Sequence, residues 1–428
     1  MPRFEDVTAD GVLVGSYGCP VHKLTVAQGT ALSAGAVLGT GIISMPALAA
    51  AIAGPASLVA WLALVLLSAP LAWTFAELGA RFPDGGGVSS YVRRAFGTWA
   101  ADAIGWIFYF AVPLGAPVAC SFAAGYVADV FGGAQFARVG TFLGILGVAF
   151  TMNWLGLHVS GRMQLALAGV LAVLLLITVL AALPHADPAN LTPFAPAGWA
   201  GIGSAAALLV WAFAGWEAVS SLSPEYADPR RDVPRATMLA VVVVGVLYLS
   251  VAVACVLVLG PGLATSEAPL ADLLAIGVGG PVRPVIAVVA VLMTLGAVNA
   301  YVAGATKLGS ALARQGALPY RLFGTDRRSL AFVGAAAVVM EAVPLGLHTL
   351  MLLVTGGLTL VYVAGTAAAV RLLPGLVAKA VAAFSLVCVS VLLVLTGWLA
   401  LAGLGVAAAA VGHRLWADRR RALANEVK

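Results

Sequence analysis

The chain has 428 residues, of which 62% are hydrophobic and only 10% are charged. A soluble globular protein carries about 25% charged residues, so this composition excludes one and predicts an integral membrane protein with apolar helices along almost its whole length. The formal net charge of +5 would suggest a nucleic-acid partner in a soluble protein, but here the basic residues fall in short loops, where orientation in a bilayer explains them better.

Twelve apolar segments follow one another along the chain. Each is long enough to cross a hydrocarbon core of roughly 30 Å as a helix, some of them with tilt. The predicted spans are residues 24–52, 57–80, 98–130, 138–158, 163–183, 201–222, 235–260, 283–313, 330–347, 349–370, 376–396 and 398–416. The expected fold class is therefore an all-α membrane protein with 12 transmembrane helices. The ninth and tenth spans are parted only by a tight turn near His348, so their boundary is the least distinct.

Lys and Arg side chains predict the orientation of these spans, since they favour the cytoplasmic side of a membrane. With the N-terminus placed inside, only Arg138 and Arg283 fall in outer loops, and Lys307 falls within a span. The rest of the 23 Lys and Arg residues lie on the inner side or in the tail. This bias predicts an even number of spans in the plasma (inner) membrane, with both ends of the chain in the cytoplasm.

Glycine interrupts the first and the sixth predicted spans. Residues 38–42 read LGTGI, and residues 213–217 read FAGWE. Backbone groups freed by a broken helix are tolerated at membrane depth only where they line a cavity, so two such breaks predict a substrate site. Close helix–helix packing is the alternative, because small residues serve that purpose too. The residues expected to contact substrate at the breaks are Gly39, Thr40, Gly41, Ile42, Phe213, Ala214, Gly215 and Trp216.

The two breaks offer complementary chemical groups. N–H groups freed at the start of the half-helix after Gly41 carry partial positive charge and suit a carboxylate. Pro46 leaves one more backbone acceptor open nearby. Carbonyls left by the half-helix before Gly215 can accept hydrogen bonds from an ammonium group. An α-amino acid has these two charged ends, and Phe213 and Trp216 offer apolar walls, although such residues more often pack or face lipid.

The two interrupted spans are five apart, so the second unit enters the membrane from the opposite side. This arrangement predicts an inverted repeat of five plus five helices, with broken helices 1 and 6 and a pseudo-twofold axis in the membrane plane. The expected divisions are a cytoplasmic N-terminal segment (1–23), the first repeat (24–183), the second repeat (201–370), helices 11 and 12 (376–416) and a basic cytoplasmic tail (417–428).

Ionisable groups inside a span are expensive and therefore informative. Glu217 directly follows the second break and could carry a proton, or it could accept hydrogen bonds from backbone N–H groups; we favour the second role. Lys307 could extend toward the inner surface or pair with an oxygen, or it could take part in coupling as a positive charge in place of a bound cation. Sodium coupling stays open as well, because Thr306 and Ser310 place hydroxyl groups near the same span.

Three further polar residues are expected near the middle of the membrane. Tyr109 lies in the third span, and Asn299 and Tyr301 lie in the eighth. We expect them to line the cavity. No dedicated acidic cluster accompanies them, which argues against cationic polyamines as substrates.

The sequence contains no signature of an enzyme. It has no GxSxG, HExxH, Walker loop or paired-cysteine metal motif. The glycine-rich residues 81–87 (RFPDGGG) lack the strand and the Lys-Ser/Thr pair of a phosphate loop, and are better explained as a turn or a gate hinge. We therefore expect no cofactor and no catalytic residue.

Several of these motifs resemble a known family. They are residues 39–42 (GTGI) with 45–46 (MP), 76–83 (AELGARFP) with 85–87 (GGG) and 91–97 (YVRRAFG), 213–217 with 224–225 (PE) and 228–236 (DPRRDVPRA), and more weakly 307–319. The chain resembles the amino acid–polyamine–organocation transporter superfamily, and the motifs frame the first eight spans. Residues 54–58 (GPASL) and the short length are similar to the bacterial amino-acid efflux branch, whose members export methionine and branched-chain amino acids.

The resemblance implies the leucine-transporter fold, alternating access, and an amino acid bound between helices 1, 3, 6, 8 and 10. Two departures bear on coupling. Some proton-coupled relatives have a lysine in helix 5, whereas residues 167–171 here read LAGVL. Lys307 stands where many relatives have arginine, so the charge is retained but not the bidentate hydrogen bonding.

The resulting hypothesis is a secondary transporter that moves small neutral, apolar amino acids, with proton-coupled efflux as the expected direction. An uptake permease or exchanger for amino acids or amines is the alternative. A non-transporting sensor would require a large soluble domain or a partner-binding tail, and neither is evident. The sequence leaves the exact amino acid, the coupling ion and the oligomeric state open.

Overall fold

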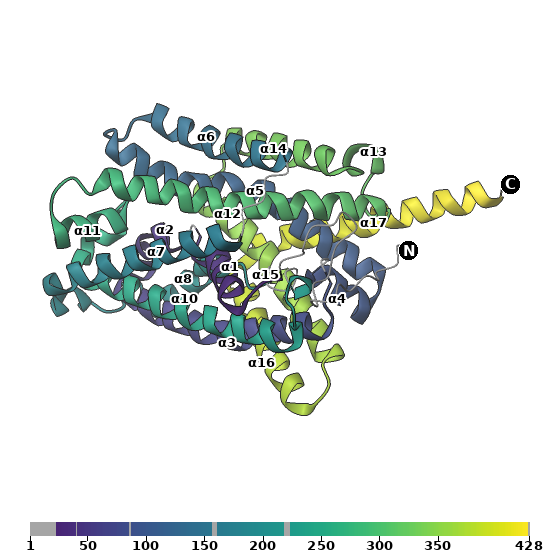
Figure 1. The fold of residues 1–428 in the computed structure, drawn as a ribbon, viewed down its shortest axis with the longest axis horizontal. Helices are drawn as coiled ribbons and strands as arrows, with labels where there is room; N and C mark the ends of the chain where they lie inside the picture. The colour runs from purple at the N-terminus through teal and green to yellow at the C-terminus, as the bar shows by residue number, and fades with distance from the viewer. Residues whose placement is uncertain (1–22, 40, 85–86, 156–160, 218–222, 427–428) are drawn as a thin grey trace, which may run out of the picture.

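The computed structural model describes residues 23–39, 41–84, 87–155, 161–217 and 223–426 (Figure 1). Regular structure within these ranges is helical, apart from an isolated bridge between Leu24 and Tyr226. Most of the long helices run along the longest axis of the molecule (Figure 1).

Helix occupies each of the twelve segments predicted to span the membrane. The first segment contains two helices, α1 (Val26–Leu38) and α2 (Gly41–Ala53), and the others contain one main helix each. These are α3 (Ser57–Arg81), α5 (Thr98–Val130), α6 (Gln135–Trp154), α7 (Gly161–Ala182), α8 (Gly198–Phe213), α10 (Pro229–Leu259), α12 (Arg283–Arg314), α14 (Asp326–Ala342), α15 (Leu347–Leu372), α16 (Leu376–Leu395) and α17 (Ala400–Glu426).

Short helices fill several of the connections that the sequence analysis left as loops. The α-helical ones are α4 (Gly87–Phe96), α11 (Pro269–Val278) and α13 (Tyr320–Phe323). The 3-10 turns are η1 (Gly54–Ala56), η2 (Leu183–His185), η3 (Pro188–Leu191), η4 (Ser223–Glu225), η5 (Gly260–Thr265) and η6 (Gly397–Leu399).

Nine helical stretches in the described ranges are long and apolar enough to cross a membrane, and the first of these runs from Val26 to Arg81 through α1, α2 and α3. The chain is therefore a multi-pass helical membrane protein. By the same measure α8 and α11 are shorter apolar helices. The count of twelve spans remains a prediction.

The two glycine-containing breaks are present as interruptions of helix. α1 ends at Leu38 and α2 begins at Gly41, while α8 ends at Phe213 and residues 214–217 form a turn. Gly215 has a φ of +127°, a backbone conformation that only glycine adopts readily. Thr40 lies outside the described residues, as do residues 218–222 that follow the second break.

The broken helices lie inside a packed bundle. α1 packs against α10 and α7, and α2 packs against α8. Around them, α3 packs against α10 and α5 packs against α12. One large hydrophobic cluster runs through these helices and includes the fully buried Trp61, Phe75 and Tyr91. The breaks are thus held at the centre of the molecule.

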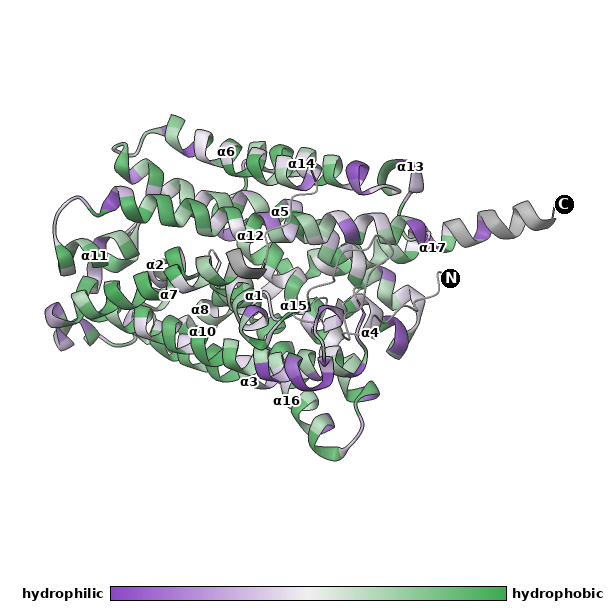
Figure 2. Ribbon diagram, in the orientation of Figure 1, coloured by the Kyte–Doolittle hydropathy of each residue, from purple (hydrophilic) through white to green (hydrophobic). Residues whose placement is uncertain are grey.

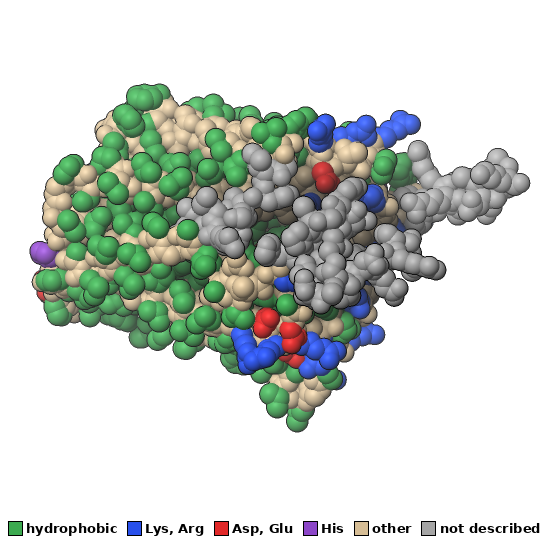
Figure 3. Space-filling view, viewed as in Figure 1, with side chains coloured by type: hydrophobic (Ala, Val, Ile, Leu, Met, Phe, Trp, Pro, Cys, Tyr) green, Lys and Arg blue, Asp and Glu red, His purple; other side chains and the backbone are tan. Residues whose placement is uncertain are grey.

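The outer surface is apolar over most of its length. Green, hydrophobic ribbon covers the long helices in Figure 2, and the corresponding face is dominated by hydrophobic side chains in Figure 3. Lys and Arg side chains gather toward the end where α4 and α13 lie (Figure 3). A bilayer accounts for both features, because lipid covers apolar side chains and basic residues concentrate on one side.

Candidate functional site

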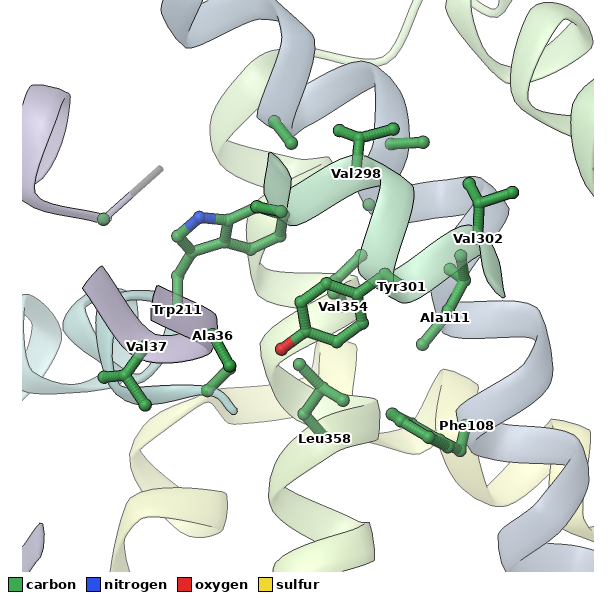
Figure 4. A pocket seen from close by; sticks show the side chains of 17 residues that line it. Ala36, Val37, Phe108, Ala111, Trp211, Val298, Tyr301, Val302, Val354 and Leu358 are labelled. Carbon is green, nitrogen blue, oxygen red and sulfur yellow. The ribbon is translucent and has the colours of Figure 1, made fainter. Parts of the chain in front are cut away.

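A cavity of about 70 Å³ lies between the two broken spans and three long helices. Six helices and the second break contribute its 17 lining residues (Figure 4). They are Ala36, Val37, Gly41, Phe108, Ala111, Val112, Gly115, Ala116, Ala119, Trp211, Ala214, Ala297, Val298, Tyr301, Val302, Val354 and Leu358. In order of predicted span, these residues belong to helices 1, 3, 6, 8 and 10.

The side chains that line this cavity are apolar except for two polar groups, the indole N–H of Trp211 and the hydroxyl of Tyr301. Tyr301 of α12 brings a phenol hydroxyl, which points toward Ala36 and Leu358 in Figure 4. No carboxylate, ammonium or guanidinium group belongs to the lining residues. Polar contacts to a bound molecule would therefore come from the main chain at the breaks, from this phenol and from the Trp211 indole N–H.

Gly41 brings α2 into close contact with α8. A Cβ atom at this position would lie 2.6 Å from the Cα of Ala212 and 3.0 Å from the hydroxyl oxygen of Tyr248. The same residue lines the cavity as the first residue of α2, where N–H groups have no partner within the helix. Gly41 therefore both packs against α8 and lines the cavity.

Gly215 shapes the second break. Besides its positive φ, a Cβ here would lie 3.1 Å from the carbonyl carbon and oxygen of Ala36 and 3.1 Å from Cγ2 of Val37. A side chain at this position would be strained and would push against the end of α1. The glycine thus allows the two breaks to approach each other.

Tyr248 of α10 links both breaks through one hydroxyl group. Its oxygen lies 2.6 Å from the carbonyl oxygen of Val37 and 2.8 Å from that of Ala212. Its single hydrogen can be donated to one of the two carbonyls at a time. Sequence reasoning missed this residue, because Tyr248 lies in the seventh predicted span and its partners lie in the first and the sixth, so no local pattern marks the contact.

Glu217 is buried beside the second break. One of its carboxylate oxygens, Oε2, accepts hydrogen bonds from the Gly215 N–H at 2.9 Å and from the Tyr362 hydroxyl at 2.6 Å. Its Oε1 has no hydrogen-bond partner within normal distance in the described part of the chain, and the Tyr301 phenol interacts with the carboxyl group at longer range. The side chain therefore holds the turn and lies near the Tyr301 phenol of the cavity wall.

The other residues expected at the first break are close to the cavity. Gly39 ends α1, and a Cβ on it would lie 3.0 Å from the Cβ of the lining residue Ala297. Ile42 is fully buried directly after Gly41. At the second break Ala214 lines the cavity itself.

Four predicted site residues contact other parts of the molecule instead of the cavity. The Phe213 ring packs edge-on against Tyr248, and Trp216 is fully buried with its Nε1 unpartnered among the residues described. Tyr109 lies 3.1 Å from the Ser329 hydroxyl, and Asn299 accepts a hydrogen bond from the Asn153 amide at 2.8 Å. The sequence analysis noted that residues such as Phe213 more often pack or face lipid than bind substrate, and the Phe213 ring packs against Tyr248.

Lys307 is exposed on α12, and the described ranges contain no ion pair to it. Of the two neighbouring hydroxyl groups, that of Ser310 donates to the Asp326 carboxylate, and that of Thr306 is buried without a described partner. The side chains of Lys307, Thr306 and Ser310 do not line the cavity.

Trp211, Gly115 and Val354 form part of the wall and were not singled out from the sequence. Trp211 lies in the last turn of α8, at a spacing of three residues before Ala214, where the helix has ended. That spacing was the available signal for Trp211. Gly115 and Val354 lie in helices that are apolar all round, so nothing local marks their cavity-facing side.

Comparisons with known proteins identify the family to which the chain belongs. The family model described as amino acid permease matches residues 24–398. The amino acid permease YecA of Bacillus subtilis (strain 168) is 33% identical over 326 residues, which is 75% of this chain and 77% of that protein.

Two other relatives have names that specify a substrate class. The L-methionine/branched-chain amino acid exporter YjeH of Escherichia coli (strain K12) is 36% identical over 230 residues, 53% of this chain and 54% of that protein. The branched-chain amino acid permease BcaP of Bacillus subtilis (strain 168) is 29% identical over 246 residues, 52% of each chain. Each of these two matches spans about half of the relative's length.

Proposed function

Because this chain belongs to the amino acid permease family, we propose that it is a secondary transporter of small neutral, apolar amino acids that works by alternating access. The observation that carries this proposal is the apolar cavity between two broken helices.

The main chain at the breaks suits a zwitterion. N–H groups at the start of α2 lack a partner within the helix and suit a carboxylate, while carbonyl groups at the ends of α1 and α8 have a second lone pair that can accept from an ammonium group, even where a tyrosine hydroxyl already donates to them. Both sets adjoin the cavity through Gly41 and Ala214. An α-amino acid would thus bind by its backbone atoms at the breaks, with its side chain directed to the rest of the cavity.

The apolar wall of the cavity determines which type of substrate side chain can bind. A charged side chain would be buried there without a countercharge, which is strongly unfavourable. Burial of an aliphatic side chain in the same cavity lowers the free energy of binding and is therefore favourable. The names of YjeH and BcaP, which specify methionine and branched-chain amino acids, point to the same class.

Counterflow in proteoliposomes tests the proposal directly. Vesicles containing the purified protein are loaded with unlabelled leucine or methionine and diluted into trace labelled amino acid. We expect transient accumulation of label, which protein-free vesicles do not give. Absence of exchange with every neutral amino acid would refute the proposal.

We propose efflux by proton antiport as the direction and coupling. The similarity to the exporter YjeH supports export, whereas the similarity to the permease BcaP supports uptake as the alternative. Inside-out vesicles with an imposed proton gradient separate the two by the sign of the driven flux. Replacing sodium with potassium in the same vesicles tests sodium coupling.

We assign Glu217 and Lys307 to coupling or gating. The hydrogen bonds from Gly215 and Tyr362 to Glu217 support a gating role, in which the carboxylate holds the second break. For Lys307, the support is its exposed position on α12 and the lack of an ion pair to it within the described ranges. A change in the pH dependence of flux in Lys307→Ala would support a coupling role, and an unchanged profile would refute it.

We further propose that residues 24–183 and 201–370 form inverted repeats, with both termini in the cytoplasm. The packing of α3 against α10 and of α5 against α12 supports this, since the members of each pair are five predicted spans apart. Accessibility of single cysteines placed in the connections to an impermeant thiol reagent tests the topology.

A further inference from the structure

One buried tyrosine of α5 lies beyond the cavity, toward the later end of that helix. Tyr126 follows the lining residue Ala119 by seven positions, which is two helical turns. The two residues therefore lie on the same face of α5, separated by about 10 Å along the helix. Tyr126 is only 1% exposed, so its side chain is enclosed by neighbouring elements.

The hydroxyl group of Tyr126 joins two of these elements. It donates a hydrogen bond to the carbonyl oxygen of Ile43 in the first turn of α2, at 2.5 Å. It also accepts a hydrogen bond from the N–H of Leu270 in the first turn of α11, at 3.2 Å. An N–H group in the first turn of a helix has no acceptor within that helix, so the phenol supplies one. A single hydroxyl thus holds the half-helix that follows the first break against both α5 and α11.

Ion pairs join α11 to the long helices around it. Arg283 of α12 pairs with Asp272 of α11 and with Asp129 of α5, and Arg138 of α6 pairs with Glu267 just before α11. α2 packs against α11 as well, and the Tyr126 hydrogen bond attaches it to this group. α11 lies at the opposite end of the molecule from α4 and α13, where Lys and Arg side chains gather (Figures 1 and 3). Under the proposed topology, the end with α11 is the outer one.

We propose that Tyr126 is the gating residue on the outer side of the cavity. In this structure its hydroxyl holds the first turn of α2 closed against α5 and α11. A substrate passes between the cavity and the outside only when α2 moves away and both hydrogen bonds break. This inference rests on the proposed function and deepens it, because it names the contact that controls access from one side of the membrane.

Tyr126→Phe removes the hydroxyl and keeps the ring. In the closed state this substitution leaves the Leu270 N–H buried without an acceptor, whereas in the open state water can accept from it. The change therefore disfavours the closed state alone and shifts the population toward the open one. Tyr109→Phe is the matched control. It also removes a buried, hydrogen-bonded hydroxyl from α5, but that hydroxyl contacts Ser329 of α14 and neither α2 nor α11.

A cysteine in the cavity wall measures opening from each side of the membrane. In the full-length protein the four native cysteines are replaced by alanine, and the reporter is introduced as Ala119→Cys. A small, charged, membrane-impermeant methanethiosulfonate reagent is added to right-side-out or inside-out vesicles, and the rate of modification is measured. Modification needs no substrate, so it reports on access to the cavity independently of transport.

We expect Tyr126→Phe to raise the rate of modification from the outer side by about fivefold or more, since a hydrogen bond is lost in the closed state alone. The rate from the inner side should not rise, because a larger outward-open population leaves fewer molecules open to the inside. Tyr109→Phe should leave both rates unchanged. The inference is overturned if Tyr126→Phe does not raise the outer rate, if it raises the inner rate equally, as a loosened fold would, or if Tyr109→Phe gives the same increase.

Leucine counterflow by the wild type tests the proposed function separately. If the wild type exchanges leucine and Tyr126→Phe leaves the outer rate unchanged, the gating inference fails and the proposed function stands. If the wild type exchanges no neutral amino acid but Tyr126→Phe raises the outer rate alone, the proposed function fails and the contact is still a gate to the cavity.

Discussion

Tyr248 places one hydroxyl group between the main-chain oxygens of Val37 and Ala212. Phenylalanine in its place would keep the ring against Trp61 and Phe213 but would remove the donor that both buried carbonyls share. We expect Tyr248→Phe to lower the free energy of unfolding by about 1–3 kcal/mol. It should also reduce transport, because the two breaks lose their common contact. Thermal melting and counterflow measure the two effects.

Tyr226 provides the matched control for this substitution. It is as buried as Tyr248, but its hydroxyl has no hydrogen-bond partner within the described ranges. Tyr226→Phe should therefore leave melting and transport close to the wild type. An equal loss in both variants would attribute the effect to the loss of any buried hydroxyl rather than to the shared contact.

Glu217 can be tested by a substitution that keeps its hydrogen-bond acceptor. The side-chain oxygen of glutamine can still accept from the Gly215 N–H and the Tyr362 hydroxyl, so Glu217→Gln should retain most transport with an unchanged pH profile. Glu217→Leu should lose transport, because the freed N–H and hydroxyl remain buried and unsatisfied. A flattened pH profile in the glutamine variant would instead identify Glu217 as the proton carrier.

At the scale of elements, the contact between α2 and α8 depends on Gly41. A valine there would force its Cβ toward the Ala212 backbone, where the available distance is 2.6 Å, so the two helices would have to separate. We expect Gly41→Val to abolish counterflow and to lower the melting temperature. Gly296→Val of α12 introduces the same β-branched side chain at a position where a Cβ has no neighbouring atom from another part of the molecule within 4 Å, and should transport normally. Loss of transport in both variants would contradict the role of this contact.

The positions of helices and breaks were predictable from the sequence for a local reason. Long apolar segments specify helix in a bilayer, and glycine at Gly39, Gly41 and Gly215 marks where the backbone leaves it. The faces of those helices were not predictable. A helix that is hydrophobic all round carries no periodic signal, so Gly115 and Val354 became recognisable only when neighbouring helices enclosed them. The sequence likewise offered no means of distinguishing Phe213 from Trp211. In the structure Phe213 packs against Tyr248, whereas Trp211 lines the cavity.

At the scale of the whole molecule, ion pairs tie helices together at both ends. Arg283 at the start of α12 pairs with Asp129 of α5 and Asp272 of α11. At the other end, the buried Asp102 of α5 lies 3.2 Å from Arg414 of α17 and 3.7 Å from Arg93 of α4. The central helix α5 is therefore anchored at each end, while the breaks lie between the anchors.

Asp102→Asn removes the carboxylate that both guanidinium groups share. We expect the free energy of unfolding to fall by about 2–3 kcal/mol, since one partner of a buried charge cluster is lost. Asp84→Asn is the comparison, because the Asp84–Arg94 pair is exposed and separated by 4.0 Å, and should change stability by less than about 1 kcal/mol. Differential scanning calorimetry in detergent measures both. Equal effects would show that burial of Asp102 does not matter to stability.

Main-chain groups and side chains of the cavity recognise different parts of the ligand, and this has a consequence for how the protein can evolve. Under the proposed function, the zwitterionic part of the ligand is recognised by main-chain groups at the breaks, and most point mutations cannot delete a main-chain group. The aliphatic part is recognised by side chains such as Trp211 and Val354, which one nucleotide change can replace. Recognition of an amino acid is thus robust to mutation while the choice among amino acids is labile, so new substrate ranges can arise without rebuilding the transport machinery.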